Sequence, residues 1–181
     1  MSNNKLFRIA AWCALLAALL MVSFFVVFSV APTSGIGEIL AVIGVLVLTP
    51  VFYALYIAHR SESAVLSLAG LVLWVPAGIL DIASLLNPAN TFLFAVDSVV
   101  FSLPLLIFGF LACRSAKTPR GLAGMALLSG VLYLIAGVAS FIASATIGSL
   151  AGLGGLAFML VWFVWLWRVF HRGNWQQHSP P

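Results

Sequence analysis

The sequence has very little charge. Only 7% of its 181 residues are charged, four acidic and eight basic, whereas 64% are hydrophobic and the mean hydropathy is +1.20. A soluble domain is typically about 25% charged, so this chain lacks the polar residues needed to cover a water-facing surface. The scarcity of charge excludes most hydrolases, kinases and nucleic-acid-binding domains, and it indicates an integral membrane protein.

Residue patterns that hold common cofactors and metals are also missing. The chain has two cysteines and three histidines, with no glycine-rich phosphate loop and no Cys–His cluster. The long apolar stretches contain neither a central histidine pair for a b-type haem nor a lysine for a retinal Schiff base. We therefore expect no cofactor, no metal and no catalytic residues. We also expect no nucleic-acid partner, because the basic residues are scattered over four short segments.

Long uncharged stretches predict six membrane-spanning helices. About 20 apolar residues cross a hydrocarbon core of roughly 30 Å. The uncharged stretch 121–167 would be about 70 Å long as one helix, so it must fold back, and the small and polar residues at 144–149 are the expected turn. The predicted spans are 9–30, 37–58, 64–86, 91–113, 122–143 and 150–170.

The basic residues predict the orientation of these helices. With six spans, every lysine and arginine falls on the same side, and such residues favour cytoplasmic loops. We therefore expect an all-α integral membrane protein in which residues 1–172 form one six-helix bundle with short loops and cytoplasmic termini. Residues 173–181 are predicted to be a disordered cytoplasmic tail. The basic residues are Lys5, Arg8, Arg60, Arg114, Lys117, Arg120, Arg168 and Arg172.

Two aspartates flank the predicted turn at 87–90. Asp81 lies six residues before this turn and Asp97 seven residues after it, so the two would lie at similar depth, about 9–10 Å from the turn. Acidic residues inside membrane helices are candidates for binding a ligand or a proton. In the alternative, which we favour, the apolar cores are only 64–80 and 98–113, and both acids lie in the headgroup layer.

Prolines near the middle of three predicted helices predict kinks. A proline inside a helix removes one N–H donor and bends the helix. Such kinks could enclose a cavity for a neutral, hydrophobic ligand, although we favour kinks that only serve helix packing. The candidate cavity-lining residues are Thr49, Pro50, Pro76, Ser102 and Pro104.

Small residues recur at every fourth position across the last predicted turn. This spacing is typical of closely packed membrane helices. It does not specify packing within one chain or between chains, and packing within the chain is our default. The residues are Ala136, Ser140, Ser144, Gly148 and Gly152.

Tryptophans gather near the predicted cytoplasmic end of the last helix. They are Trp162, Trp165 and Trp167. Amphipathic rings at this depth predict an interfacial aromatic belt and need no bound pigment or quinone to explain them.

Several helix ends resemble those of a known family. The segments are NKLFRIA at 4–10, FYALY at 52–56, PRGLA at 119–123 followed by GVLY at 130–133, and WFVWLWR at 162–168. They resemble a bacterial family of multi-pass proteins known as a domain of unknown function. The resemblance implies a compact helical bundle in a bacterial inner membrane, and it carries over no functional residue.

The scarcity of polar groups favours a non-catalytic role. We expect an accessory or scaffold subunit, or a binder of a lipid or another hydrophobic small molecule, in the inner (cytoplasmic) membrane. Its partners would be the bilayer, a hydrophobic molecule, and a second membrane protein or another copy of itself. The alternative is a small transporter or channel that uses the three kinked helices with Asp81 and Asp97. An intramembrane enzyme ranks last, because the acids are predicted on one side and the histidines and cysteines on the other.

Overall fold

The computed structural model describes residues 3–30, 35–87, 89–142 and 144–172. This part of the chain forms six α-helices, and all six are long and apolar enough to cross a membrane. The predicted tail at 173–181 lies outside the described residues. The helices are α1 (Asn3–Val30), α2 (Ile36–His59), α3 (Ala64–Leu86), α4 (Thr91–Arg114), α5 (Arg120–Phe141) and α6 (Ala145–His171).

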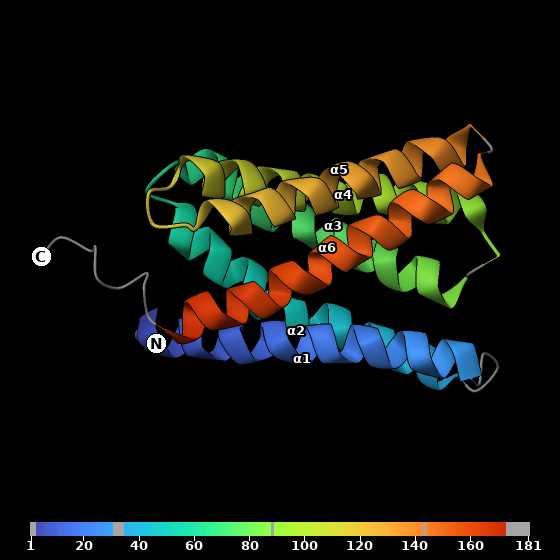
Figure 1. The fold of residues 1–181 in the computed structure, drawn as a ribbon, viewed down its shortest axis with the longest axis horizontal. Coiled ribbons are helices and arrows are strands. Elements are labelled where there is room, and N and C mark those ends of the chain that lie inside the picture. The colour runs from blue at the N-terminus through green and yellow to red at the C-terminus, as the bar shows by residue number, and fades with distance from the viewer. Residues whose placement is uncertain (1–2, 31–34, 88, 143, 173–181) are drawn as a thin grey trace, which may run out of the picture.

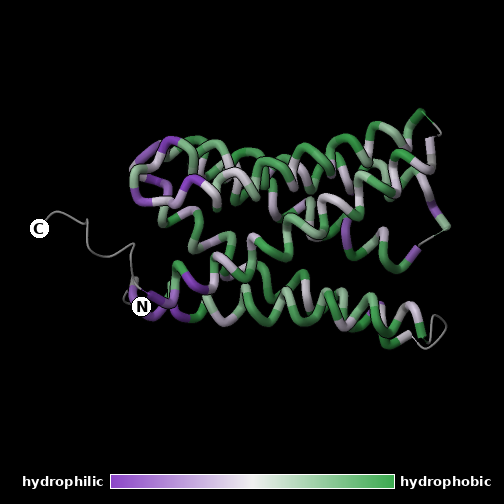
Figure 2. The backbone as a smooth tube through the Cα atoms, in the orientation of Figure 1, coloured by the Kyte–Doolittle hydropathy of each residue, from purple (hydrophilic) through white to green (hydrophobic). Residues whose placement is uncertain are grey.

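The six helices form a ring in chain order. Each helix packs against the next one, and α6 closes the ring by packing against α1 (Figure 1). All eight lysines and arginines lie toward the end where α1 begins and α6 ends, which is the most hydrophilic part of Figure 2. We call this the basic end. The opposite end, where α1, α3 and α5 end, is called the acidic end, because Glu38, Asp81 and Asp97 lie nearer to it.

Two helix boundaries differ from the predicted spans by five or six residues, and the others agree within two. Helix α1 begins at Asn3, six residues earlier than predicted, because the polar segment before the apolar stretch continues the same helix. Helix α6 begins at Ala145, so the residues placed in a turn at 145–149 are helical. The Gly148 N–H donates to the Ser144 carbonyl over 2.9 Å. A small residue at 148 serves close packing on α5 and does not break the helix.

Glycines set the closest approaches between helices. A Cβ atom added to Gly137 of α5 would lie 2.7 Å from the Ala95 carbonyl oxygen of α4, and one added to Gly148 of α6 would lie 2.9 Å from Ser140 Oγ. The stripe of small residues therefore packs α5 against α6 within one chain. The α4–α5 contact uses a second set of glycines, which the sequence pattern did not single out. They are Gly109, Gly130 and Gly137.

Large aromatic side chains fill the ring between its middle and the basic end. Phe52 stacks on Trp74 with 4.1 Å between ring centroids, and it contacts Phe108 at 5.9 Å and Trp162 at 6.5 Å. We call these four residues the aromatic plug. Trp162 is only 2% exposed, so its prediction as part of an interfacial belt is wrong. It faces the inside of the ring, whereas Trp165 is only partly buried.

Candidate functional site

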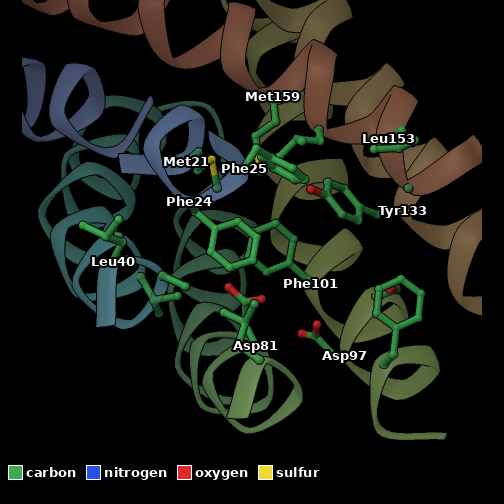
Figure 3. Close-up of a pocket in the computed structure, with 18 of the residues that line it drawn as sticks. Met21, Phe24, Phe25, Leu40, Asp81, Asp97, Phe101, Tyr133, Leu153 and Met159 are labelled. Carbon is green, nitrogen blue, oxygen red and sulfur yellow. The ribbon is translucent and has the colours of Figure 1, made fainter. Parts of the chain in front are cut away.

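A cavity of about 610 Å³ lies inside the ring, between the aromatic plug and the acidic end. Its walls are mostly apolar, and every helix contributes to them. One lining residue from each helix, in chain order, is Met21, Leu40, Asp81, Asp97, Tyr133 and Met159 (Figure 3). The whole ring is therefore needed to build this cavity.

Aromatic side chains form much of the wall. Phe101 connects the cavity to the plug, because its ring centroid lies 5.9 Å from that of Trp74 and 5.3 Å from that of Tyr133. The cavity thus ends where the densely packed aromatic region begins. The aromatic lining residues are Phe24, Phe25, Phe94, Phe101 and Tyr133.

Asp81 and Asp97 are the acidic residues of the wall. The Asp97 carboxylate points from α4 toward Asp81 of α3 (Figure 3), and the two are near enough for their charges to interact. Asp97 is 6% exposed, and its Oδ1 atom has no hydrogen-bond partner within the described ranges. Asp81 is partly buried. The Asp97 carboxyl group therefore lies inside the ring of helices, and the headgroup-layer interpretation, which concerns depth in a membrane, stays a prediction.

The α3–α4 hairpin places the two acids at one depth. Asp81 lies five residues before the end of α3 and Asp97 six residues after the start of α4, which corresponds to about 8–9 Å along each helix. The start of α4 is fixed by Asn90, whose side-chain oxygen accepts a hydrogen bond from the Leu93 N–H over 3.0 Å. Local capping and helical rise thus bring the two carboxylates to the same cavity.

The proline-kink residues do not line this cavity. Helices α2, α3 and α4 each continue through their proline. Thr49 instead accepts a hydrogen bond from Trp74 Nε1 over 3.4 Å, and Ser102 donates one to the Val99 carbonyl over 2.6 Å. The cavity-lining hypothesis for Thr49, Pro50, Pro76, Ser102 and Pro104 is therefore wrong here. All five lie farther from the acidic end than the lining residues of their own helices.

Three helices on which the sequence analysis placed no cavity or ligand candidate, α1, α5 and α6, also line the cavity. Tyr133 of α5, Phe24 of α1 and Met159 of α6 were not candidates, because spacing along the chain relates only neighbouring helices. Tyr133 carried a usable signal, since a phenol far from either end of an apolar helix needs a partly polar environment.

The fourth acidic residue, Glu62, belongs to the loops at the basic end. Ser115 Oγ donates to Glu62 Oε1 over 2.7 Å, and Ser61 Oγ donates to Oε2 over 2.9 Å. Burial raises the pKa of the Glu62 carboxyl, but these hydrogen bonds outweigh it and leave the pKa below its usual value. His59 Nδ1 lies 4.0 Å from Glu62 Oε2. Glu62 thus connects the α2–α3 loop to the α4–α5 loop.

Comparisons with known proteins identified no relative of this chain. No family model, curated protein or solved structure matches this chain. The family resemblance of the helix ends therefore stays a prediction. What the cavity can do is indicated by its residues: it has room for one small molecule, apolar walls to hold it, and two carboxylates to contact a polar group.

Proposed function

We propose that this protein is a non-catalytic, multi-pass membrane protein that binds a hydrophobic small molecule or lipid in its cavity. The supporting observation is an aromatic-walled cavity of about 610 Å³, lined by six helices that are each long and apolar enough to cross a membrane. Small-molecule sites typically have volumes of about 300–1,000 Å³ and mostly apolar walls with a few polar groups. The cavity has these properties.

The proposed location is the inner (cytoplasmic) membrane of the cell, with both termini in the cytoplasm. The support is the gathering of all eight lysines and arginines at the basic end, since such residues favour the cytoplasmic side. In this orientation the aromatic plug lies toward the cytoplasmic leaflet. The cavity lies toward the opposite leaflet, from which an apolar ligand can enter between helices without crossing water.

Transport is the second candidate function. The presence of Asp81 and Asp97 in one cavity favours it, because intramembrane acids often lie on transport pathways. The plug argues against it, since Phe52, Trp74 and Phe108 are each at most 3% exposed and separate the cavity from the basic end. Binding without transport needs no rearrangement of these rings.

The proposed function can be tested by native mass spectrometry of the protein released from nanodiscs. We expect the wild-type chain to carry one lipophilic molecule at a fixed ratio. The Gly152→Leu variant should lose it, because Gly152 lines the cavity and an added Cβ atom there has only ordinary contacts, 3.8 Å from Ala136 and 4.0 Å from Phe94. A larger side chain would then occupy ligand space.

Gly124→Leu is the matched control. Nothing lies within 4 Å of a Cβ atom added to Gly124, and this residue does not line the cavity. This variant should keep the bound molecule. A bare wild-type chain, or equal occupancy in both variants with unchanged thermal stability, would contradict the proposal.

A further inference from the structure

We infer that the ligand of this cavity is a lipophilic organic cation, such as a protonated amine, whose positive charge lies beside the carboxylates of Asp97 and Asp81. This inference rests on the proposed function and specifies the chemical class of the ligand. It starts from the two acids that line the wall of an otherwise apolar space.

The first argument is the unpartnered carboxyl group of Asp97. Its Oδ1 atom is buried and accepts no hydrogen bond from the described part of the chain, and no lysine, arginine or histidine lines the cavity. A buried charge is costly unless a partner neutralises it. With a neutral ligand, Asp97 must hold a proton and its Oδ1 atom stays without a partner among the described residues, whereas a cationic ligand lets the carboxyl group ionise and supplies that partner.

The second argument concerns the kind of cation. Calcium takes six to eight oxygen ligands, and magnesium requires an octahedral shell. Among the described residues, no three His, Cys, Asp or Glu side chains gather closely enough to hold a metal ion, and Ser98 and Ser149 are the hydroxyl-bearing aliphatic side chains in the wall. Such a sparse oxygen set suits a single ammonium group better than a metal ion.

The third argument is the aromatic wall. The faces of aromatic rings attract organic cations, and this attraction grows when water is excluded. Phe24 and Phe101 line the same cavity as the acids (Figure 3), and the Tyr133 side chain is near enough for electrostatic interaction with both carboxylates. The walls therefore fit the hydrophobic body of the ligand, and the carboxylates fit its charge.

The test compares two probes of similar shape and different charge. Tetraphenylphosphonium is a permanent cation, and triphenylphosphine oxide is neutral. Binding of each is measured by equilibrium dialysis with nanodisc-embedded protein at pH 7.5, with empty nanodiscs subtracted. Because a charge-assisted contact is strong, we expect Asp97→Asn to weaken binding of the cation by about tenfold or more. Asp81→Asn should weaken it less, since Asp81 is more exposed.

Glu38→Gln is the matched control. It removes a carboxylate near the acidic end that does not line the cavity, and it should leave the affinity for both probes unchanged. The neutral probe should bind the wild type and Asp97→Asn equally.

The outcomes separate this inference from the proposed function. One outcome is that the neutral probe binds the wild type but not Gly152→Leu, while the cation binds the wild type no more tightly than it binds Asp97→Asn. In that case the cationic class of the ligand is wrong and the proposed binding function stands. If neither probe binds the wild type, both proposals fail. Displacement of the cation by 1 mM calcium chloride would also overturn the inference, because it would identify an inorganic cation site.

Discussion

Toward the basic end, Phe52, Trp74 and Phe108 pack ring against ring, whereas toward the acidic end the same ring of helices surrounds a cavity of about 610 Å³. The acids differ in the same way. Glu62 at the basic end accepts hydrogen bonds from two serines, whereas the Oδ1 atom of Asp97 in the cavity has no partner in the described structure. Glu62 is thus hydrogen-bonded within the chain, whereas Asp97 leaves a buried atom, unsatisfied among the described residues, beside open space. Such unsatisfied positions are where function is expected.

The largest predicted effect tests the packing difference directly. Phe108→Ala should lower the free energy of unfolding by about 3 kcal/mol, because the ring is 1% exposed and its removal leaves a void in the plug. Phe94→Ala should cost less than about 1 kcal/mol, since Phe94 is 39% exposed and already borders open space. Reversible unfolding in mixed micelles measures both. Equal losses would show that the two halves are packed alike.

The second prediction concerns Asp97, the buried acid that lines the cavity. Asp97→Leu should raise the free energy of unfolding of the ligand-free protein by about 1–2 kcal/mol, because a buried, unpartnered carboxyl is replaced by an apolar group. Glu38→Gln should change it by less than about 0.5 kcal/mol. The same micelle assay applies. A loss of stability in Asp97→Leu would mean that the carboxyl supports the fold.

The third prediction concerns the acid at the basic end. Ser115→Ala should cost about 1 kcal/mol near neutral pH, since it removes the 2.7 Å hydrogen bond to Glu62. Because the pKa of Glu62 is lowered in the folded state, this stabilisation is present above the unfolded pKa of about 4.3 and is lost as the pH falls through the lower, folded value. The difference in stability between the wild type and the variant should therefore shrink at low pH to the part due to the Lys117 N–H, which donates to Ser115 Oγ over 3.3 Å.

Ser29→Ala is the control for this titration. Ser29 is exposed and donates to the Phe25 carbonyl within its own helix. The difference in the free energy of unfolding between Ser29→Ala and the wild type should stay constant with pH. A constant difference for Ser115→Ala as well would show that Glu62 gains nothing from this contact.

The smallest predicted effect concerns the free space beside Gly152 in the cavity wall. Gly152→Ala should stabilise the protein by about 0.5 kcal/mol, because alanine favours helix and the added methyl group has only ordinary contacts. Gly124→Ala, at an open position, should give the same gain. Thermal unfolding midpoints suffice for this comparison. If Gly152→Ala is destabilising while Gly124→Ala is not, the wall at Gly152 has less room than the cavity indicates.

Much of the fold follows from simple features of the sequence. Gaps between charged residues separate the six helices, and α3 begins and ends at the predicted residues 64 and 86. The start of α6 was predicted five residues too late, because glycine and serine at 144–149 fit either a turn or a closely packed helix. Composition alone does not separate these two uses of small residues.

The site was less predictable because it depends on how each helix is rotated. The rotation of α4 about its axis buries Asp97. This rotation is fixed by the close approach of α4 and α5 at Gly109, Gly130 and Gly137. The sequence shows that these glycines exist, but not which neighbour they face. The same limit explains Trp162, whose place in a belt or in the plug is decided by helix rotation.

The ring order of the helices has a consequence for the timing of assembly during synthesis. Contacts between successive helices can form as each one leaves the ribosome, because domains and motifs that are local in sequence fold early. The α1–α6 contact joins the two extremes of the chain, with Phe7 and Phe170 only 5.3 Å apart between ring centroids. The cavity is therefore completed only by the last helix. A chain truncated before residue 145 would have all four of its acidic residues and five of its helices, and still no complete cavity.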